Sequence, residues 1–412
     1  MSRSLKLNSV LISLTLFGIV FFLYLCIYAQ TMTFDMANSI FLAAAVGGSF
    51  CIYADIFYKD SDRVLYWMGW MTSIFILLII ELFTNLFFVI LSLWMLGAIH
   101  LISHILCEQK NQTKIMIINC CVYISVPLFI IISNNFLAFS GLTRPLVYDQ
   151  FLMAIDGTLG FYPNLVLGRF FSELPGFISS LILAIYLALP TAIILIYLKR
   201  LNYAIEPPYS FMIEVIFIGF LGFSLYNIIP GCGAIPSFNT WPQSLSPGFL
   251  QNSPQLISCP SSFPRNALPS LHTAWIICLL RQAWLCNKEV KVLASIFAFG
   301  TVIAMFGVGH YLIDLIVGFS FANFTGGLCA FHLNWKSKAR LQAILLGGLL
   351  SLSWYLIIFY GIPVLQSSKI LAWTLFLAST FLSLYLEFRL FKGSKSQSGD
   401  YSRGENVPEF AV

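Results

Sequence analysis

The chain has 412 residues, of which 59% are hydrophobic and only 9% are charged, with a formal net charge of +5. Soluble domains carry roughly 25% charged residues, so the composition excludes a soluble globular protein, a disordered protein and a nucleic-acid-binding protein. A bilayer-spanning helix takes about 20 apolar residues, and the apolar residues here suffice for about twelve such helices.

Apolar stretches of spanning length recur from the N-terminus almost to the C-terminus. They predict an all-α fold, a polytopic transmembrane bundle of about twelve helices. The first stretch follows Arg3 and Lys6, is long, and lacks a small-residue cleavage site, so we expect a retained helix rather than a signal peptide. The stretches lie at roughly 8–29, 38–57, 65–84, 86–106, 115–135, 176–198, 209–229, 269–285, 290–309, 311–331, 341–362 and 370–391.

The distribution of lysine and arginine predicts the topology, because cytosolic loops carry an excess of both. The segment 65–106 has no polar loop and is interpreted as two helices. With both termini cytosolic, all but four of the 22 basic residues then lie inside. The four exceptions are Arg144, Arg169, Arg265 and Lys369.

Two long segments between helices, 136–175 and 230–268, fall on the outer side and are rich in glycine, proline and aromatic residues. We therefore expect four regions along the chain. They are an N-terminal accessory transmembrane region at 1–114, a catalytic core at 115–331, two C-terminal transmembrane helices at 332–392, and a disordered cytosolic tail at 393–412.

Two of the five histidines, His272 and His310, are expected at the outer membrane face. Asp314 follows His310 by four residues, which on a helix places both side chains on one face. A carboxylate there fixes the imidazole tautomer and raises its basicity. A structural ion pair is the alternative, but a charge pair is costly to bury in a membrane without a use.

Phosphate binding is expected around His272. Pro269 and Ser270 suit the first turn of a helix, whose free N–H groups favour anions. Arg144 and Arg265 lie on the outer side, and arginine suits the forked hydrogen bonding of phosphate oxygens. The alternatives are an ordinary capped helix and arginines that reach lipid headgroups.

The motifs RNALPSLHTAW and GHYLIDLIVG resemble the active-site pair of the type 2 phosphatidic acid phosphatase superfamily, most closely its inositol phosphorylceramide synthase-like branch. The resemblance covers about 115–331. It implies a six-helix core in which His310 attacks phosphorus, Asp314 orients His310, and His272 protonates the departing oxygen.

The chain departs from the family's phosphatases at positions where those enzymes carry phosphate-binding cations. Leu137 replaces a lysine, and Ile303 and Ala304 replace a Ser-Arg pair. Fewer cations fit a singly charged phosphodiester better than a doubly charged monoester.

The predicted function is therefore a membrane lipid phosphotransferase that moves a phospho-headgroup from a phospholipid to a lipid hydroxyl, with an extracytosolic active site and no metal or other cofactor. The first alternative is a lipid or polyprenyl phosphate phosphatase that uses water as acceptor. A transporter, or a catalytically inactive lipid-binding module, is a further alternative. The polar residues cluster at one membrane face and the sequence has no evident internal repeat, which argues against a transporter. His272, His310 and Asp314 are all present, which argues against an inactive module.

Cys232 and Cys259 both lie in the outer segment 230–268. In an oxidising compartment they can pair as a disulfide or remain free thiols, and a bridge would stabilise the fold by about 3–4 kcal/mol. The sequence leaves both alternatives open.

Overall fold

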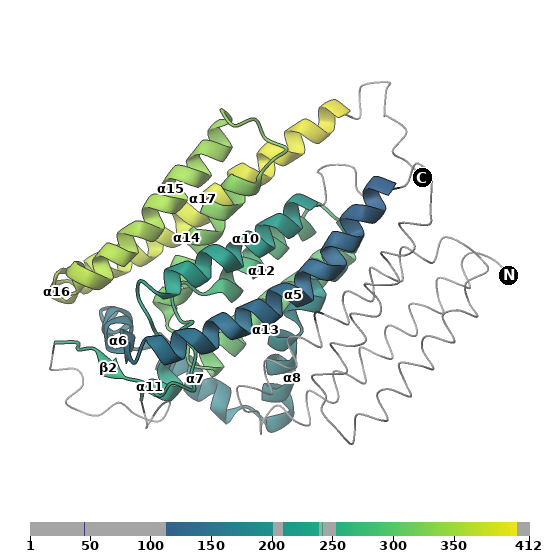
Figure 1. The fold of residues 1–412 in the computed structure, drawn as a ribbon. Coiled ribbons are helices and arrows are strands. Elements are labelled where there is room, and N and C mark those ends of the chain that lie inside the picture. The colour runs from purple at the N-terminus through teal and green to yellow at the C-terminus, as the bar shows by residue number, and fades with distance from the viewer. Residues whose placement is uncertain (1–44, 46–112, 201–208, 239–240, 242–252, 402–412) are drawn as a thin grey trace, which may run out of the picture.

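The computed structural model describes residues 45, 113–200, 209–238, 241 and 253–401. The first four predicted spans, and with them nearly all of the accessory region 1–114, lie outside the described residues. The described part is a helical bundle with one short two-stranded sheet (Figure 1).

The elements of the first half begin with a long helix and continue through shorter ones. They are α5 (Thr113–Thr143), β1 (Leu146–Val147), α6 (Asp149–Gly157), α7 (Pro163–Glu173), α8 (Gly176–Leu187), α9 (Leu189–Arg200), α10 (Tyr209–Tyr226) and α11 (Ala234–Ser237).

The second half holds four of the longer helices. Its elements are β2 (Ile257–Ser258), α12 (Leu271–Ala283), α13 (Lys288–Gly307), α14 (Leu312–Cys329), α15 (Lys338–Leu356), the π-helical turn η4 (Ile357–Gly361), α16 (Ile362–Ser367) and α17 (Lys369–Tyr401).

Each apolar stretch predicted from residue 115 onward coincides with a helix or with a bent pair of helices. Within the described residues, five helical segments are long and apolar enough to cross a membrane, or six if α8 and α9, bent by 53°, form one span. The apolar part of α10, Ser210–Tyr226, is shorter than the 18 residues taken as the minimum for a span, and α12 has 13 residues. At the C-terminus, α17 continues to Tyr401, so helix extends into the segment predicted to be disordered from residue 393.

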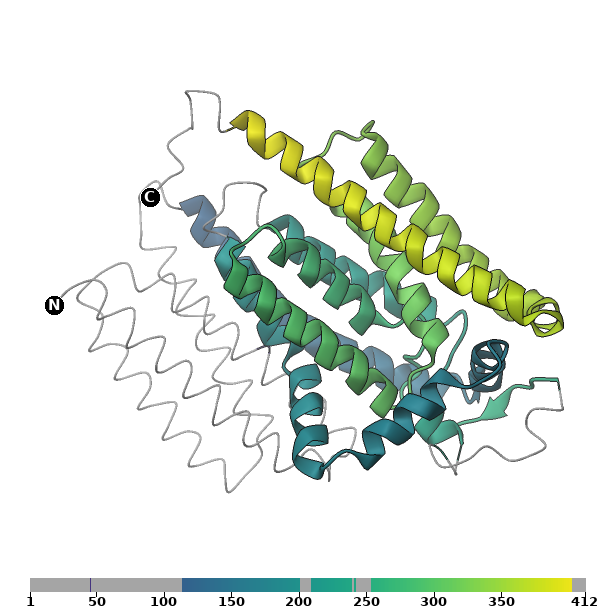
Figure 2. The same cartoon turned by 180° about the vertical axis from the view of Figure 1, so that it is seen from behind.

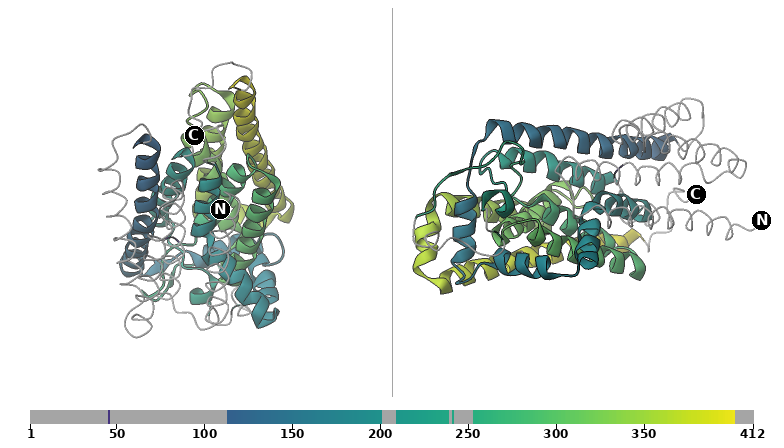
Figure 3. Two further views of the ribbon diagram at one scale, coloured as in Figure 1. Left: turned by 90° about the vertical axis from the view of Figure 1, so that its right-hand side faces the viewer. Right: turned by 90° about the horizontal axis from the view of Figure 1, so that it is seen from below.

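The helix α14 occupies the centre of the bundle. Its most apolar window is 67% buried, against 28–44% for the other four single spans. One hydrophobic cluster joins it to α5, α8, α9, α10, α12 and α13. A second joins it to α6 and to the C-terminal elements α15 to α17. Seen from the side and from below, α5 lies at one edge of the bundle and α17 at the opposite edge (Figure 3).

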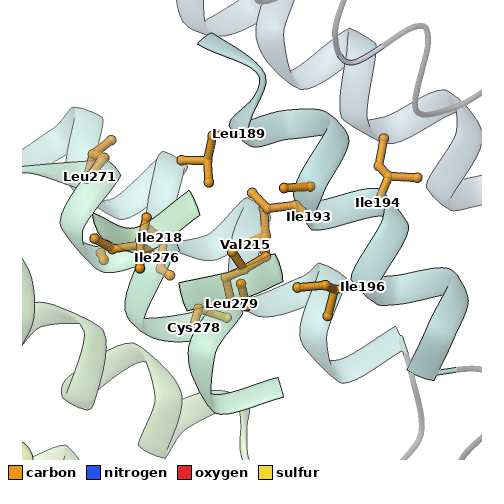
Figure 4. Close-up of a cluster of buried hydrophobic side chains, with 14 of the residues drawn as sticks. Leu189, Ile193, Ile194, Ile196, Val215, Ile218, Leu271, Ile276, Cys278 and Leu279 are labelled. Carbon is orange, nitrogen blue, oxygen red and sulfur yellow. The ribbon is translucent and has the colours of Figure 1, made fainter. Parts of the chain in front are cut away.

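The first cluster contains side chains that are buried almost completely between α9, α10 and α12. Figure 4 shows Ile193, Val215 and Leu279 meeting there. Because β-branched and leucine side chains pack at near-crystalline density, this interior fixes the relative positions of the three helices. It thereby fixes the N-terminus of α12, where the site begins.

The helices α6, α7 and α11 and the small sheet gather at one end of the bundle, and α5 begins and α17 ends at the other (Figures 1 and 2). The antiparallel strands pair Leu146 with Ser258 and Val147 with Ile257. A disulfide joins Cys232 to Cys259 beside this sheet. The two long segments predicted between helices therefore fold against each other.

Candidate active site

The helices α12 and α14 begin side by side. The backbone N–H of Ser270 donates to the carbonyl oxygen of Asp314 at 3.0 Å. Gly318 packs so closely on the carbonyl of Ser270 that a Cβ at this position would collide with it. A glycine is required for this approach, which brings the two histidine motifs together across 38 positions of sequence.

The His310 imidazole is 3.2 Å from Asp314, from Nδ1 to Oδ2. The same oxygen accepts the backbone N–H of Tyr311 at 2.9 Å. Asp314 is fully buried and His310 is 8% exposed. A buried carboxylate on Nδ1 leaves Nε2 as the nitrogen available for nucleophilic chemistry.

The physical reason for this contact differs from the predicted one. Because α14 begins at Leu312, with Tyr311 as its N-cap, His310 lies before the helix rather than on its face. Asp314 is the third residue of the helix and its carboxylate turns back over the N-terminus, as in a capping box. The pair therefore forms through the cap, not through helical periodicity.

His272 lies in the first turn of α12. Its ring stacks on Tyr186 of α8 at 4.3 Å and meets Trp275 edge to face at 5.6 Å. Its Nδ1 is 3.3 Å from the Tyr186 hydroxyl. The hydrogen bond from Ser270 to Asp314 holds the turn that carries His272 beside the partner of His310. The structure thus brings together the three side chains predicted to be catalytic.

The loop before His310 has a conformation that favours glycine. Gly309 has a φ of 95°, and its carbonyl accepts the N–H of Ala234 at 2.8 Å. A Cβ at residue 309 would lie 2.9 Å from the backbone nitrogen of Ile235. The backbone N–H of His310 donates to the carbonyl of Met305 at 2.9 Å. The loop is therefore held from both α11 and α13.

Two buried aspartates on α6, absent from the predicted site, hold the residues on the other side of His310. Asp156 accepts the N–H groups of Leu312 and Ile313 at 2.7 and 3.1 Å. Asp149 accepts the Tyr311 hydroxyl at 2.9 Å. Both aspartates are completely buried.

Asp149 also accepts two backbone N–H groups from the segment before α11. Cys232 donates at 3.0 Å and Gly233 at 2.7 Å. A sequence signal for both aspartates existed: they are seven residues apart, which is two helical turns and one helix face.

Burial dominates the electrostatics of these two carboxyl groups. It raises the pKa of Asp149 to about 6, while the N–H of Cys232 and the hydroxyl of Tyr311 act in the opposite direction. Burial raises the pKa of Asp156 to about 8, against the N–H groups of Leu312 and Ile313. The negative charge of Asp314 raises both, so the three carboxyl groups share one electrostatic environment.

Arg265 does not fit its predicted role as a phosphate ligand. It is 0% exposed, and its guanidinium donates to five backbone carbonyls, which uses all of the donors that an arginine has. The acceptors are the carbonyls of Arg144, Pro260, Phe263, Gly141 and Cys259, at 2.6–3.3 Å. Arg265 instead ties the loop after β2 to the C-terminal end of α5.

Ser270 likewise has structural partners in place of a phosphate. Its side chain accepts the N–H of Thr273 as the N-cap of α12, and its hydroxyl lies 3.1 Å from the sulfur of Met305. The side chain is fully buried. Arg144, by contrast, is exposed at the end of α5, so of the predicted phosphate ligands it is the one whose side chain faces outward.

Among the residues that the structure describes, no group of three His, Cys, Asp or Glu side chains could hold a metal ion. The contacts described above bring two imidazoles and three carboxyl groups into this region. This set can supply a nucleophile, a proton donor and an orienting base.

Comparison with known proteins gives one match, to a family model that covers part of the chain. No curated protein and no solved structure matches the chain. Residues 150–328, which carry both histidines, Asp156 and Asp314, match the model of the PAP2 superfamily, and Asp149 directly precedes the matched segment.

Proposed function

We propose that the protein is a membrane phosphotransferase that moves a phospho-headgroup from a phospholipid to a lipid hydroxyl, in the manner of inositol phosphorylceramide synthases. The observation that carries the proposal is the pairing of His310 with Asp314 beside His272, at the adjacent N-termini of α12 and α14. The match of residues 150–328 to the PAP2 superfamily supports phosphoryl chemistry at these residues.

In the first half-reaction, Nε2 of His310 attacks the phosphorus of a phosphodiester. The bond between phosphorus and the lipid oxygen breaks, and protonated His272 gives its proton to that oxygen. Phosphorus is then bound to His310 and carries the headgroup, and diacylglycerol leaves. Asp314 stabilises the positive charge that develops on the imidazole.

In the second half-reaction, His272 accepts the proton of the acceptor hydroxyl. The resulting oxygen attacks phosphorus, the nitrogen–phosphorus bond breaks, and His310 is restored. Atoms and charges balance with the donor lipid and the acceptor alone, and no cofactor enters the reaction.

The charge of the site supports a singly charged phosphodiester as substrate. Three carboxyl groups surround the nucleophile, and the guanidinium of Arg265 is already bound by backbone carbonyls. The carboxyl group of Asp314, which contacts the nucleophile, repels a doubly charged monoester more than a diester when it is ionised. Arg144, which is exposed, is the cation that we assign to the phosphate.

The second candidate is a lipid or polyprenyl phosphate phosphatase, in which water replaces the lipid hydroxyl in the second half-reaction. The match to the PAP2 superfamily favours it equally, because both reactions use the same residues. We assign the reaction to the extracytosolic face, in either case, from the distribution of basic residues.

The test uses the full-length protein in nanodiscs with a labelled phospholipid panel, with and without ceramide or diacylglycerol. A new phosphodiester lipid that requires the acceptor indicates a transferase. Release of phosphate or phospho-headgroup without acceptor indicates the hydrolase and overturns the first proposal.

Three variants test the site. His310→Ala and His272→Ala should each abolish turnover without loss of folding. His332→Ala is the matched control, because His332 lies beyond the C-terminus of α14, at the opposite end of that helix. Retention of turnover in either of the first two variants rules out the mechanism.

A further inference from the structure

We propose that Asp149 and Asp156, here called the aspartate clamp, are positioning residues that set the attack geometry of His310 without touching substrate. The inference rests on the proposed function and extends it to α6, an element outside both histidine motifs. The clamp acts through the backbone on both sides of His310.

Asp156 controls the residues after His310. Its two carboxyl oxygens each accept one N–H from the first turn of α14, from Leu312 at 2.7 Å and Ile313 at 3.1 Å. This turn also contains Asp314, the partner of His310. A shift of the turn therefore moves the orienting carboxylate relative to the imidazole.

Asp149 controls the residues on either side of the imidazole. It binds the hydroxyl of Tyr311, which directly follows His310. It also fixes the backbone of Gly233, and the next residue, Ala234, donates to the carbonyl of Gly309, which directly precedes His310.

The clamp also changes what the N-terminus of α14 can bind. Free N–H groups at a helix N-terminus attract anions, phosphate among them. Here the carboxyl group of Asp156 occupies two of these N–H groups. The helix start is therefore committed to holding His310 in place, and the substrate phosphate is held by other groups.

The burial of α6 makes this support rigid. Both aspartates are 0% exposed, and α6 packs against α7, α14, α16 and η4. Displacing either carboxyl group would require α6 to move against all of these elements. Catalytic geometry is sensitive to such movement, because a misplacement of about 1 Å can cost about 100-fold in rate.

The primary variant is Asp156→Asn, which is nearly isosteric but presents an amide group to one of two N–H donors. We expect kcat to fall by about 10- to 100-fold while KM changes by less than about threefold, because the change affects geometry and not binding. The matched control is Glu173→Gln, which also replaces a carboxyl group with an amide but at an exposed residue of α7.

A second readout is independent of activity. The chain has five histidines, so ¹⁵N-histidine labelling gives a simple spectrum in which His310→Ala identifies the His310 signal. In Asp156→Asn we expect the His310 signal to shift while that of His332 stays in place. Glu173→Gln should leave both unchanged.

The inference is overturned if Asp156→Asn keeps kcat within about twofold of wild type and its His310 signal is unchanged. If the wild-type protein turns over no lipid, the proposed function fails, and the NMR comparison still decides the clamp. If Asp156→Asn does not fold, Tyr311→Phe removes a single hydroxyl from the clamp and is subject to the same two measurements, with a smaller expected fall in kcat.

Discussion

Arg265 offers the sharpest test of how the segments 136–175 and 230–268 are held together. Its guanidinium donates to five carbonyls from two parts of the chain, the end of α5 and the loop after β2. Arg265→Lys keeps the positive charge but offers three donors on one nitrogen, in place of five donors in a planar fork.

At least two of the five carbonyls must then lose their partner. An unsatisfied buried acceptor costs about 1–3 kcal/mol, so the free energy of unfolding should fall by roughly 2–6 kcal/mol. We would measure it by tryptophan fluorescence during equilibrium unfolding in mixed micelles containing sodium dodecyl sulfate. KM for the phospholipid should be unchanged in the protein that remains folded.

Arg144→Lys is the matched comparison, because Arg144 is a neighbouring arginine whose side chain is exposed. Its unfolding free energy should stay within about 0.5 kcal/mol of wild type. Because we assign Arg144 to the substrate phosphate, Arg144→Lys should raise KM for the phospholipid. The reasoning is refuted if Arg265→Lys unfolds like wild type and raises KM, because Arg265 would then bind phosphate instead of backbone.

Three further predictions concern other buried groups. Gly309→Ala should reduce turnover and destabilise the fold by about 1–2 kcal/mol in the same unfolding assay, because φ is 95° at this residue. Burial raises the pKa of Asp149 from 3.8 to about 6, so the native state binds a proton that the unfolded chain has lost. Asp149 should therefore lower the free energy of unfolding as pH rises from 4 to 6, by at most about 1.4 kcal/mol per pH unit. Asp149→Asn should remove this contribution and leave that of Asp156, whose pKa is also raised. An equal slope in wild type and Asp149→Asn would contradict the assignment. Arg281 is bound to Glu214 and Glu387 at 2.7 and 2.6 Å. Arg281→Met should cost about 3–5 kcal/mol in unfolding free energy, because the buried carboxylate of Glu214 and the partly buried carboxylate of Glu387 lose their partner. Normal stability of this variant would show that the carboxylates are neutral without the arginine.

The helices could be predicted because their signal is local. Apolar runs bounded by polar residues predict spans directly, and the longer helices between α5 and α17 follow the predicted stretches. The helices α6, α7 and α11 lie in the segments 136–175 and 230–268 and were not predicted. The bend of 53° between α8 and α9 was missed. It falls just before Pro190, a residue that has no N–H for a helical hydrogen bond.

The site could be predicted in part, for a similar reason. His310 and Asp314 are close in sequence, and the pairing with His272 followed from a common membrane face and the family resemblance. The role of Arg265 was not accessible, because its partners are backbone carbonyls that become neighbours only when the disulfide-linked loop folds onto α5. Sequence identifies a cation but not the carbonyl groups that surround it.

The buried aspartates were missed for a different reason. A polar residue between membrane spans is ordinarily solvated, and the spacing of seven that places Asp149 and Asp156 on one helix face does not indicate that this face is buried. Their burial depends on α6 packing between the start of α14 and the turn at η4 and α16. Long-range packing of this kind is the part of the site that a single sequence cannot supply.

The C-terminal helices, expected as a region separate from the catalytic core, contribute to the support of the site. The hydrophobic cluster that contains Tyr311 and Ile313 continues into Trp354 and Phe376. The helices α15 and α17 both pack on α14, and η4 and α16 pack on α6. The helix α6, which carries the aspartate clamp, is thus packed against residues beyond 331. Since the clamp holds His310 through α6, the geometry of the nucleophile depends on helices that follow both histidine motifs in the chain.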